Sequence, residues 1–218
     1  AVMGGYWREA GAKGLFGGGH DGSNGSATID KIIMSTAGDA TDFGDLSLAR
    51  WSHGTASSFT KSIWAGGQST PGGNVNVIDY ITFSTEGNAA DFGNLTVARG
   101  QVGAGSNSIR GIALGGATPS RVNTIDFVTI ASIGNATDFG DATVSRNEIA
   151  PMFSPTRGCF AGGRTPTVLN TIDFVEISTT GNATDFGDLS VATSTAGGAA
   201  SSVRGVVAGG FSPSLTSV

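Results

Sequence analysis

Hydrophobic and polar residues recur along this chain in a unit of nearly fifty residues. Ile-Asp pairs lie at Ile29/Asp30, Ile78/Asp79, Ile125/Asp126 and Ile172/Asp173, in steps of 49, 47 and 47 residues. The phenylalanine of a near-identical Asp-Phe-Gly segment recurs in the same steps at Phe43, Phe92, Phe139 and Phe186. A period of this size is typical of propeller blades or solenoid turns.

The pattern inside each unit predicts four short strands. A basic residue, a small residue and an apolar run precede a glycine pair, as in 110–116, and an alternating segment rich in β-branched and aromatic residues follows, as in 123–130. A Gly-Asn-Ala-Thr-Asp-Phe-Gly turn then leads to a third strand, expected at 188–192 in the fourth unit. A fourth strand of small residues is expected at 100–104, 148–153 and 195–199. The chain is therefore expected to be all-β, with the turn phenylalanines and Trp64 in the core.

The order of these features resembles the kelch repeat of β-propellers. The glycine-pair strand, the strand with an aromatic residue, the aromatic before a leucine and the following Arg50, Arg99 and Arg146 carry this resemblance, although phenylalanine stands where kelch repeats have tryptophan. It implies one kelch-like β-propeller domain of four full blade repeats and a partial fifth. The repeats run approximately over 1–49, 50–98, 99–145, 146–192 and 193–218. A longer propeller cut within a blade is favoured over an incomplete fifth blade that closes the ring.

The amino-acid sequence of the repeats also resembles that of repeats in virion or tail-fibre proteins of marine phages, especially phages of cyanobacteria. That resemblance implies a non-enzymatic structural or tail-fibre module, exposed on the virion or extracellular, which binds a host surface glycan or another virion protein. One alternative is a kelch-type protein interaction module of a bacterial surface or secreted protein. The other is an enzyme with a site in the propeller channel.

Charge narrows the classes of partner. The net charge is −5, and the 12 Lys and Arg residues are dispersed, which argues against nucleic acid and anionic membranes. No apolar run approaches the roughly 20 residues of a membrane span, so membrane insertion is not expected. A single cysteine allows no internal disulfide.

Charges that recur in every unit are interpreted as scaffold, because a site normally uses one copy of each group. We expect them to join neighbouring blades by charge-assisted hydrogen bonds. The bases are Lys13, Lys61, Arg110, Arg157 and Arg204; the acids are Asp30, Asp79, Asp126 and Asp173, together with Asp42, Asp91, Asp138 and Asp185. Calcium at Asn135, Asp138 and Asp141 is an alternative, but an Asx turn is favoured there and no metal or other cofactor is expected.

Residues that break the repeat are the candidates for recognition. These are Tyr6, Trp7, His20, Trp51 and His53. Trp51 stands where other units have Gly100, Asn147 and Ser194, so an exposed indole there could meet a sugar face or a partner pocket. Coverage of an edge or a neighbouring domain is the equal alternative for these aromatics. Neither histidine has an acid or nucleophile at a recognised spacing, so no catalytic residue is expected.

Overall fold

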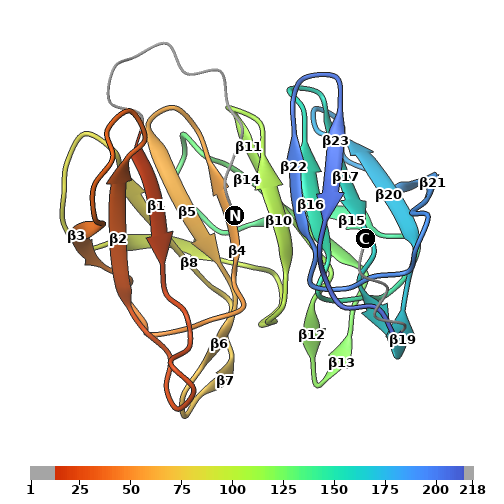
Figure 1. The fold of residues 1–218 in the computed structure, drawn as a ribbon, viewed down its shortest axis with the longest axis horizontal. Coiled ribbons are helices and arrows are strands. Elements are labelled where there is room, and N and C mark those ends of the chain that lie inside the picture. The colour runs from red at the N-terminus through yellow and green to blue at the C-terminus, as the bar shows by residue number, and fades with distance from the viewer. Residues whose placement is uncertain (1–12, 214–218) are drawn as a thin grey trace.

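The computed structural model describes residues 13–213, and this part of the chain is all-β without a helix. Antiparallel strands form a series of sheets that follow one another along the chain (Figure 1). The first sheet has three described strands, β1 (Lys13–Gly17), β2 (Thr28–Ile33) and β3 (Thr41–Asp45). Three four-stranded sheets follow, and then a pair of strands.

Each four-stranded sheet is a meander of consecutive main strands. The second sheet is β4 (Gly54–Ser57), β5 (Lys61–Ala65), β8 (Val77–Thr82) and β9 (Ala90–Asn94). The third is β10 (Gly103–Ser106), β11 (Arg110–Leu114), β14 (Thr124–Thr129) and β15 (Thr137–Asp141). The fourth is β16 (Ala150–Phe153), β17 (Arg157–Ala161), β20 (Thr171–Glu176) and β21 (Thr184–Asp188). The final pair is β22 (Gly197–Ala200) and β23 (Gly205–Ala208).

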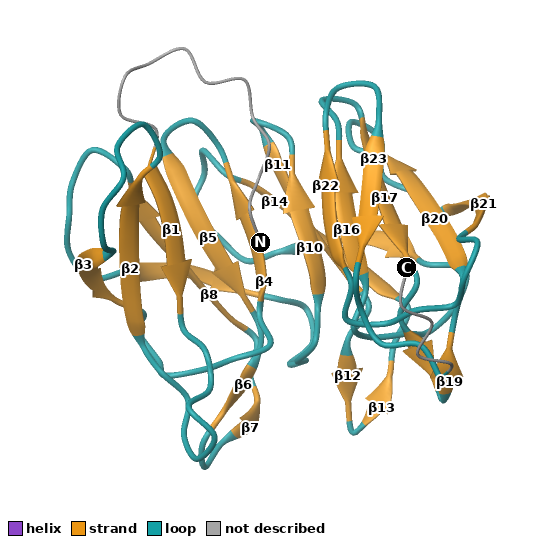
Figure 2. Cartoon of the chain, in the orientation of Figure 1, coloured by secondary structure: helices purple, strands orange, loops and turns teal. Residues whose placement is uncertain are grey.

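Three small hairpins mark one end of the molecule, which we call the hairpin end. They connect the second and third strands of the four-stranded sheets and project at the lower edge of the cartoon (Figure 2). The hairpins are β6 (Gln68–Ser69) with β7 (Gly73–Asn74), β12 (Ala117–Thr118) with β13 (Ser120–Arg121), and β18 (Arg164–Thr165) with β19 (Thr167–Val168). The connections that lead into β4, β10, β16 and β22 lie at the same end, because isolated bridges such as Trp51 with Gln68 join the two sets of loops.

The all-β prediction is confirmed, whereas two strand positions were wrong. The small-residue strand expected at 100–104 is Gly103–Ser106. The third strand of the fourth unit is Thr184–Asp188, so the Asp-Phe-Gly segment is itself the strand and 189–192 lies outside it. The reason is a β-bulge: Ile125 pairs with Gly140 and Asp126 with Asp138, which leaves Phe139 as the extra residue of β15. Residues that tolerate turns can therefore stand within this strand.

The bulge also explains why the repeated phenylalanine is core. Phe139 is 3% exposed and lies in a cluster with Val175 and Ile177 of the next sheet. Phe43 likewise packs with Trp64 and Ile81, so the expectation of a buried Trp64 is confirmed. Phe186 differs: it is 56% exposed, which corrects the core assignment for the fourth unit.

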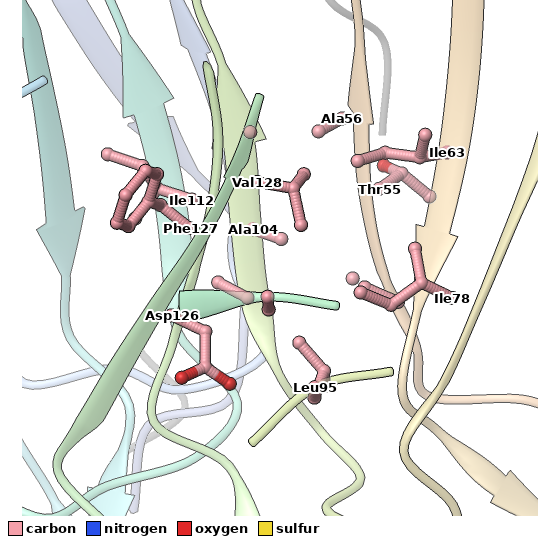
Figure 3. A pocket seen from close by; sticks show the side chains of 15 residues that line it. Thr55, Ala56, Ile63, Ile78, Leu95, Ala104, Ile112, Asp126, Phe127 and Val128 are labelled. Atoms are coloured by element: carbon pink, nitrogen blue, oxygen red, sulfur yellow. The ribbon is translucent and has the colours of Figure 1, made fainter. Parts of the chain in front are cut away.

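Neighbouring sheets pack face to face through apolar side chains. Figure 3 shows this layer between the second and third sheets, with Ile63 and Ile78 facing Val128. The gap left between them is a cavity of only about 10 Å³, close to the least volume that holds one water. The space between sheets is therefore filled core.

The small-residue strands are the first strands of their sheets and lie together. β4 contacts β10, β10 contacts β16, and β16 contacts β22. Glycine is required where these strands meet: a Cβ on Gly54 would lie 2.4 Å from the Ala104 Cβ. The first strands can approach closely because their side chains are small.

Candidate functional site

Three of the recurring Asp residues form buried ion pairs with an arginine, one in each four-stranded sheet. Arg50 lies 3.2 Å from Asp79, Arg99 3.0 Å from Asp126, and Arg146 3.1 Å from Asp173, and all six side chains have no exposed surface. Burial lowers the pKa of each arginine, and the facing aspartate raises it in part. Asp30, the first acid of this set, is only partly buried.

Each buried carboxylate also ties its sheet to the preceding one. Thr96, which follows β9, donates its backbone N–H and its hydroxyl to the two Asp126 oxygens, at 3.0 and 2.6 Å. Ser47 and Thr143 do the same for the other two acids. Both oxygens of each buried carboxylate accept hydrogen bonds from the scaffold. The Arg–Asp pairs are therefore not available to bind a ligand.

The bases before the glycine-pair strands reach the next sheet. Lys61 donates to the carbonyls of Ile130 and Ala131, and Arg110 donates to that of Ile177, at 2.9 Å. Lys13 reaches the Phe83 carbonyl in the same way. Arg157 instead pairs with Glu176 of its own sheet at 2.6 Å, and Arg204 is exposed.

The aspartates of the Asp-Phe-Gly segments make local turns. Asp42, Asp91 and Asp185 each accept the N–H of the glycine two residues later, at 3.2, 2.9 and 3.1 Å, and Asp138 is exposed at the same position of β15. The expected bond between blades is therefore wrong for Asp42, Asp91 and Asp185, because an Asx-type contact inside the strand takes up the carboxylate.

The asparagine before this segment makes the contact between sheets instead. The side-chain oxygen of Asn135 accepts the N–H of Asn94 in the preceding sheet, at 3.0 Å, which leaves that oxygen engaged. Within residues 13–213, no group of three His, Cys, Asp or Glu side chains could hold a metal ion.

A run of backbone hydrogen bonds crosses the hairpin end from one repeat to the next. Gln101 N–H donates to Ser52 C=O at 2.7 Å, Glu148 N–H to Gln101 C=O at 3.3 Å, and Thr195 N–H to Glu148 C=O at 2.9 Å. All four residues have φ between 54 and 57°, a left-handed conformation that is uncommon without glycine. Such strain persists where the surroundings fix it, often at functional sites.

Two side chains of this run, Gln101 and Glu148, form one polar network with Asn147, Arg121 and Arg164, which lie beside it. The Asn147 amide donates to Gln101 Oε1 at 2.6 Å, and the Gln101 amide donates to Glu148 Oε1 at 3.3 Å. Arg121 Nε donates to Asn147 Oδ1 at 3.2 Å, while an Arg164 nitrogen lies 4.0 Å from Glu148. Sequence reasoning missed this network. It had shown only that one position varies between repeats, where Trp51, Gly100, Asn147 and Ser194 are equivalent.

Two of the predicted recognition residues meet at the same end. The His20 and Trp51 rings lie 4.6 Å apart between centroids, at 59°. His20 is exposed and Trp51 is partly exposed, so part of the indole surface is open to solvent. Gly25 lies against the indole: a Cβ there would be 3.1 Å from Trp51 Cε3. Tyr6 and Trp7 lie outside the described residues.

His53 follows the run directly, but it is turned into the protein. A Cβ on Gly18 would lie 2.7 Å from His53 Nε2, so the ring packs against the first sheet, and its buried Nδ1 has no hydrogen-bond partner among residues 13–213. Burial, with Arg50 nearby, lowers the pKa of His53 to about 4. His53 is therefore neutral at physiological pH.

A cavity of about 550 Å³ opens between the first strands of the sheets. Its walls are mainly glycine, alanine and branched apolar side chains of β4, β10, β16, β22 and β23. Each residue of the backbone run is followed directly by a residue that lines this cavity: His53, Val102, Ile149 and Ala196. The polar network therefore lies at the mouth of an apolar cavity, an arrangement typical of ligand sites.

No protein-family model matches the sequence, and the search of curated proteins finds no match. In residues 13–213, no helix is both long and apolar enough to serve as a membrane span.

Proposed function

We propose that this chain is a non-enzymatic binding module of an exposed phage structural protein, such as a tail fibre, built as a kelch-like β-propeller. Its four-stranded meanders, which meet through their first strands, support the propeller arrangement. The similarity of its repeat sequences to repeats of marine phage proteins supports the virion assignment.

The hairpin end is the proposed ligand face. The observation that carries this proposal is the polar network at the mouth of the cavity, the one described cluster there that interrupts the periodic scaffold. Its partly exposed members, Gln101 and Glu148, are bonded to each other, and the buried Asn147 amide fixes Gln101 from below. Recognition needs unique groups, whereas the Arg–Asp pairs repeat in each four-stranded sheet.

A host surface glycan is the ligand that these groups fit best. Amide and carboxylate groups held in fixed orientation can donate to and accept from sugar hydroxyls. The Trp51 ring beside His20 offers an apolar surface of the kind that packs on a sugar face. Another virion protein is the second ligand considered.

A glycan array on the purified chain, followed by calorimetry with the best ligand, tests the proposal. Trp51→Ala and Gln101→Ala should each weaken binding at least tenfold. Phe59→Ala is the matched control, because Phe59 is an exposed aromatic in the β4–β5 turn at the opposite end. Equal losses of affinity in all three variants would overturn this ligand face. So would glycan binding that is unchanged in both Trp51→Ala and Gln101→Ala.

A separate measurement addresses the biological setting. Proteomics of purified particles from a candidate phage–host system should detect the chain in the virion at fixed copy number. Detection only in host surface fractions would favour the kelch-type interaction module. Turnover of a bound glycan that disappears in Glu148→Gln would favour the enzyme.

A further inference from the structure

One arginine of the hairpin end has a guanidinium group that the scaffold uses only in part. Arg121 lies on β13, in the β12–β13 hairpin, and its Nε donates to Asn147 Oδ1 at 3.2 Å. Its two Nη groups are not buried, and among residues 13–213 they have neither a hydrogen-bond partner nor an ion pair. The N–H donors on these two nitrogens are therefore available to a ligand.

Asn147 holds this arginine in place. Asn147 is 3% exposed, and its amide donates to Gln101 Oε1 at 2.6 Å while its oxygen accepts from Arg121. The backbone of Asn147 is also bridged to Arg164 of the next hairpin. Because Arg121 is fixed by a buried residue, little side-chain freedom remains to be lost when its Nη groups bind a partner.

The positive charge of Arg121 is in excess at this site. The arginines that precede the backbone run, Arg50, Arg99 and Arg146, are each paired with a buried aspartate. Arg164 lies 4.0 Å from Glu148, which is the one acid of the polar network. Two arginines and one carboxylate thus leave the network with one positive charge, although the whole chain has a net charge of −5.

A carboxylate is the group that the free side of this guanidinium fits. Two parallel N–H donors match the two oxygens of a carboxylate, and such charge-assisted bonds are roughly twice as strong as neutral ones. Gln101 and Glu148 are partly exposed beside Arg121, and their amide and carboxylate groups can bond to hydroxyls. A sugar that carries both a carboxylate and hydroxyls, such as a uronic or sialic acid, can engage all three side chains.

We propose that the glycan bound at the hairpin end is acidic and that the Nη groups of Arg121 bind its carboxylate, which rests on the glycan-binding function proposed above. Asn147 is a positioning residue, because it acts through Arg121 and Gln101. Gln101 and Glu148 bind the sugar hydroxyls. The acid on the ligand neutralises the one charge of the network that has no described counterpart.

A glycan array that carries galacturonate, glucuronate and sialate glycans, each beside its methyl ester, tests the ligand class on the whole chain. At least one acid should bind, and calorimetry should find its ester at least tenfold weaker, because the ester keeps the hydroxyls but loses the charge. The affinity for the acid should also fall as salt rises. Equal binding of acid and ester, or Trp51-dependent binding of neutral glycans alone, would overturn the acidic ligand and leave the proposed function standing. Absence of binding to any glycan would overturn both.

Variants of the protein test the role of Arg121. Arg121→Gln should weaken binding of the acid at least tenfold and leave the affinity for the ester unchanged. Arg204→Gln is the matched control, because it removes the same charge from an exposed arginine just before β23, at the opposite end of the molecule. Asn147→Ser should lower the ratio of acid to ester affinity, since Arg121 loses its acceptor. Equal losses in Arg121→Gln and Arg204→Gln, or an unchanged ratio in Arg121→Gln, would contradict a carboxylate site at Arg121.

Discussion

Arg99 Nη1 lies 3.0 Å from Asp126 Oδ2, and neither side chain has any exposed surface. The same guanidinium donates to the Ala113 carbonyl at 3.2 Å, so one residue before β10 holds β11 and β14 together. The pair ties the start of a repeat to the middle of its own sheet.

Removing one partner of this pair should be costly. Arg99→Met is expected to lower the free energy of unfolding by about 3 to 5 kcal/mol, because Asp126 would remain buried without its counter-charge. Adding Asp126→Leu should recover a large part of that loss. Urea unfolding of the three variants measures this, and a single-variant loss below about 1 kcal/mol would contradict a buried pair.

The two equivalent phenylalanines should respond differently to truncation. Phe139→Ala is expected to cost about 3 to 5 kcal/mol, since its ring is buried against the fourth sheet. Phe186→Ala should cost less than about 1 kcal/mol, because more than half of its surface is already in water. Equal costs in thermal and urea unfolding would show that Phe186 is covered in solution.

A second matched pair separates steric clash from backbone strain. Gly140 and Gly187 have φ of 143° and 129°, but only a Cβ at Gly140 would press on a neighbouring backbone. Gly187→Ala should cost about 1 kcal/mol from strain, and Gly140→Ala should cost at least 2 kcal/mol more. Calorimetric unfolding compares them, and similar values would argue against the tight approach of Gly181.

His53 should make stability depend on pH. Its pKa of about 4 in the fold lies below the ordinary 6.5, so the unfolded chain binds the proton first as pH falls. Stability is then full above about pH 6.5, decreases from there to about pH 4, and levels off below that, with a total loss of up to about 3 kcal/mol. Unfolding curves between pH 7 and 4 should show this slope in the native protein and lose it in His53→Gln.

Sequence reasoning succeeded where a residue's role is set by its own repeat. The Ile-Asp strand, the buried Trp64 and the buried Phe139 follow from local pattern, and all three are found. The third strand was misplaced because its turn-forming residues lie in a bulge, which needs the partner strand to define it.

The candidate site was predicted less well, because it is assembled from different repeats. Gln101 and Asn147 are 46 residues apart, and nothing local to either indicates that their amides bond. Irregular aromatics were noticed first, and His20 and Trp51 do meet, but His53 turned inward against Gly18. The sequence does carry one signal for this site. At the position that follows Arg50, Arg99 and Arg146, the residue type differs from repeat to repeat.

The contacts between sheets have an evolutionary consequence. Because Asn88, Asn135 and Asn182 make the same bond to the preceding sheet, recombination between near-identical repeat sequences could insert or delete a whole unit and keep every junction intact. The residues at the hairpin end would then change in order, since Trp51, Gly100, Asn147 and Ser194 differ. Unequal crossing-over would thus vary the proposed ligand face while it conserved the scaffold.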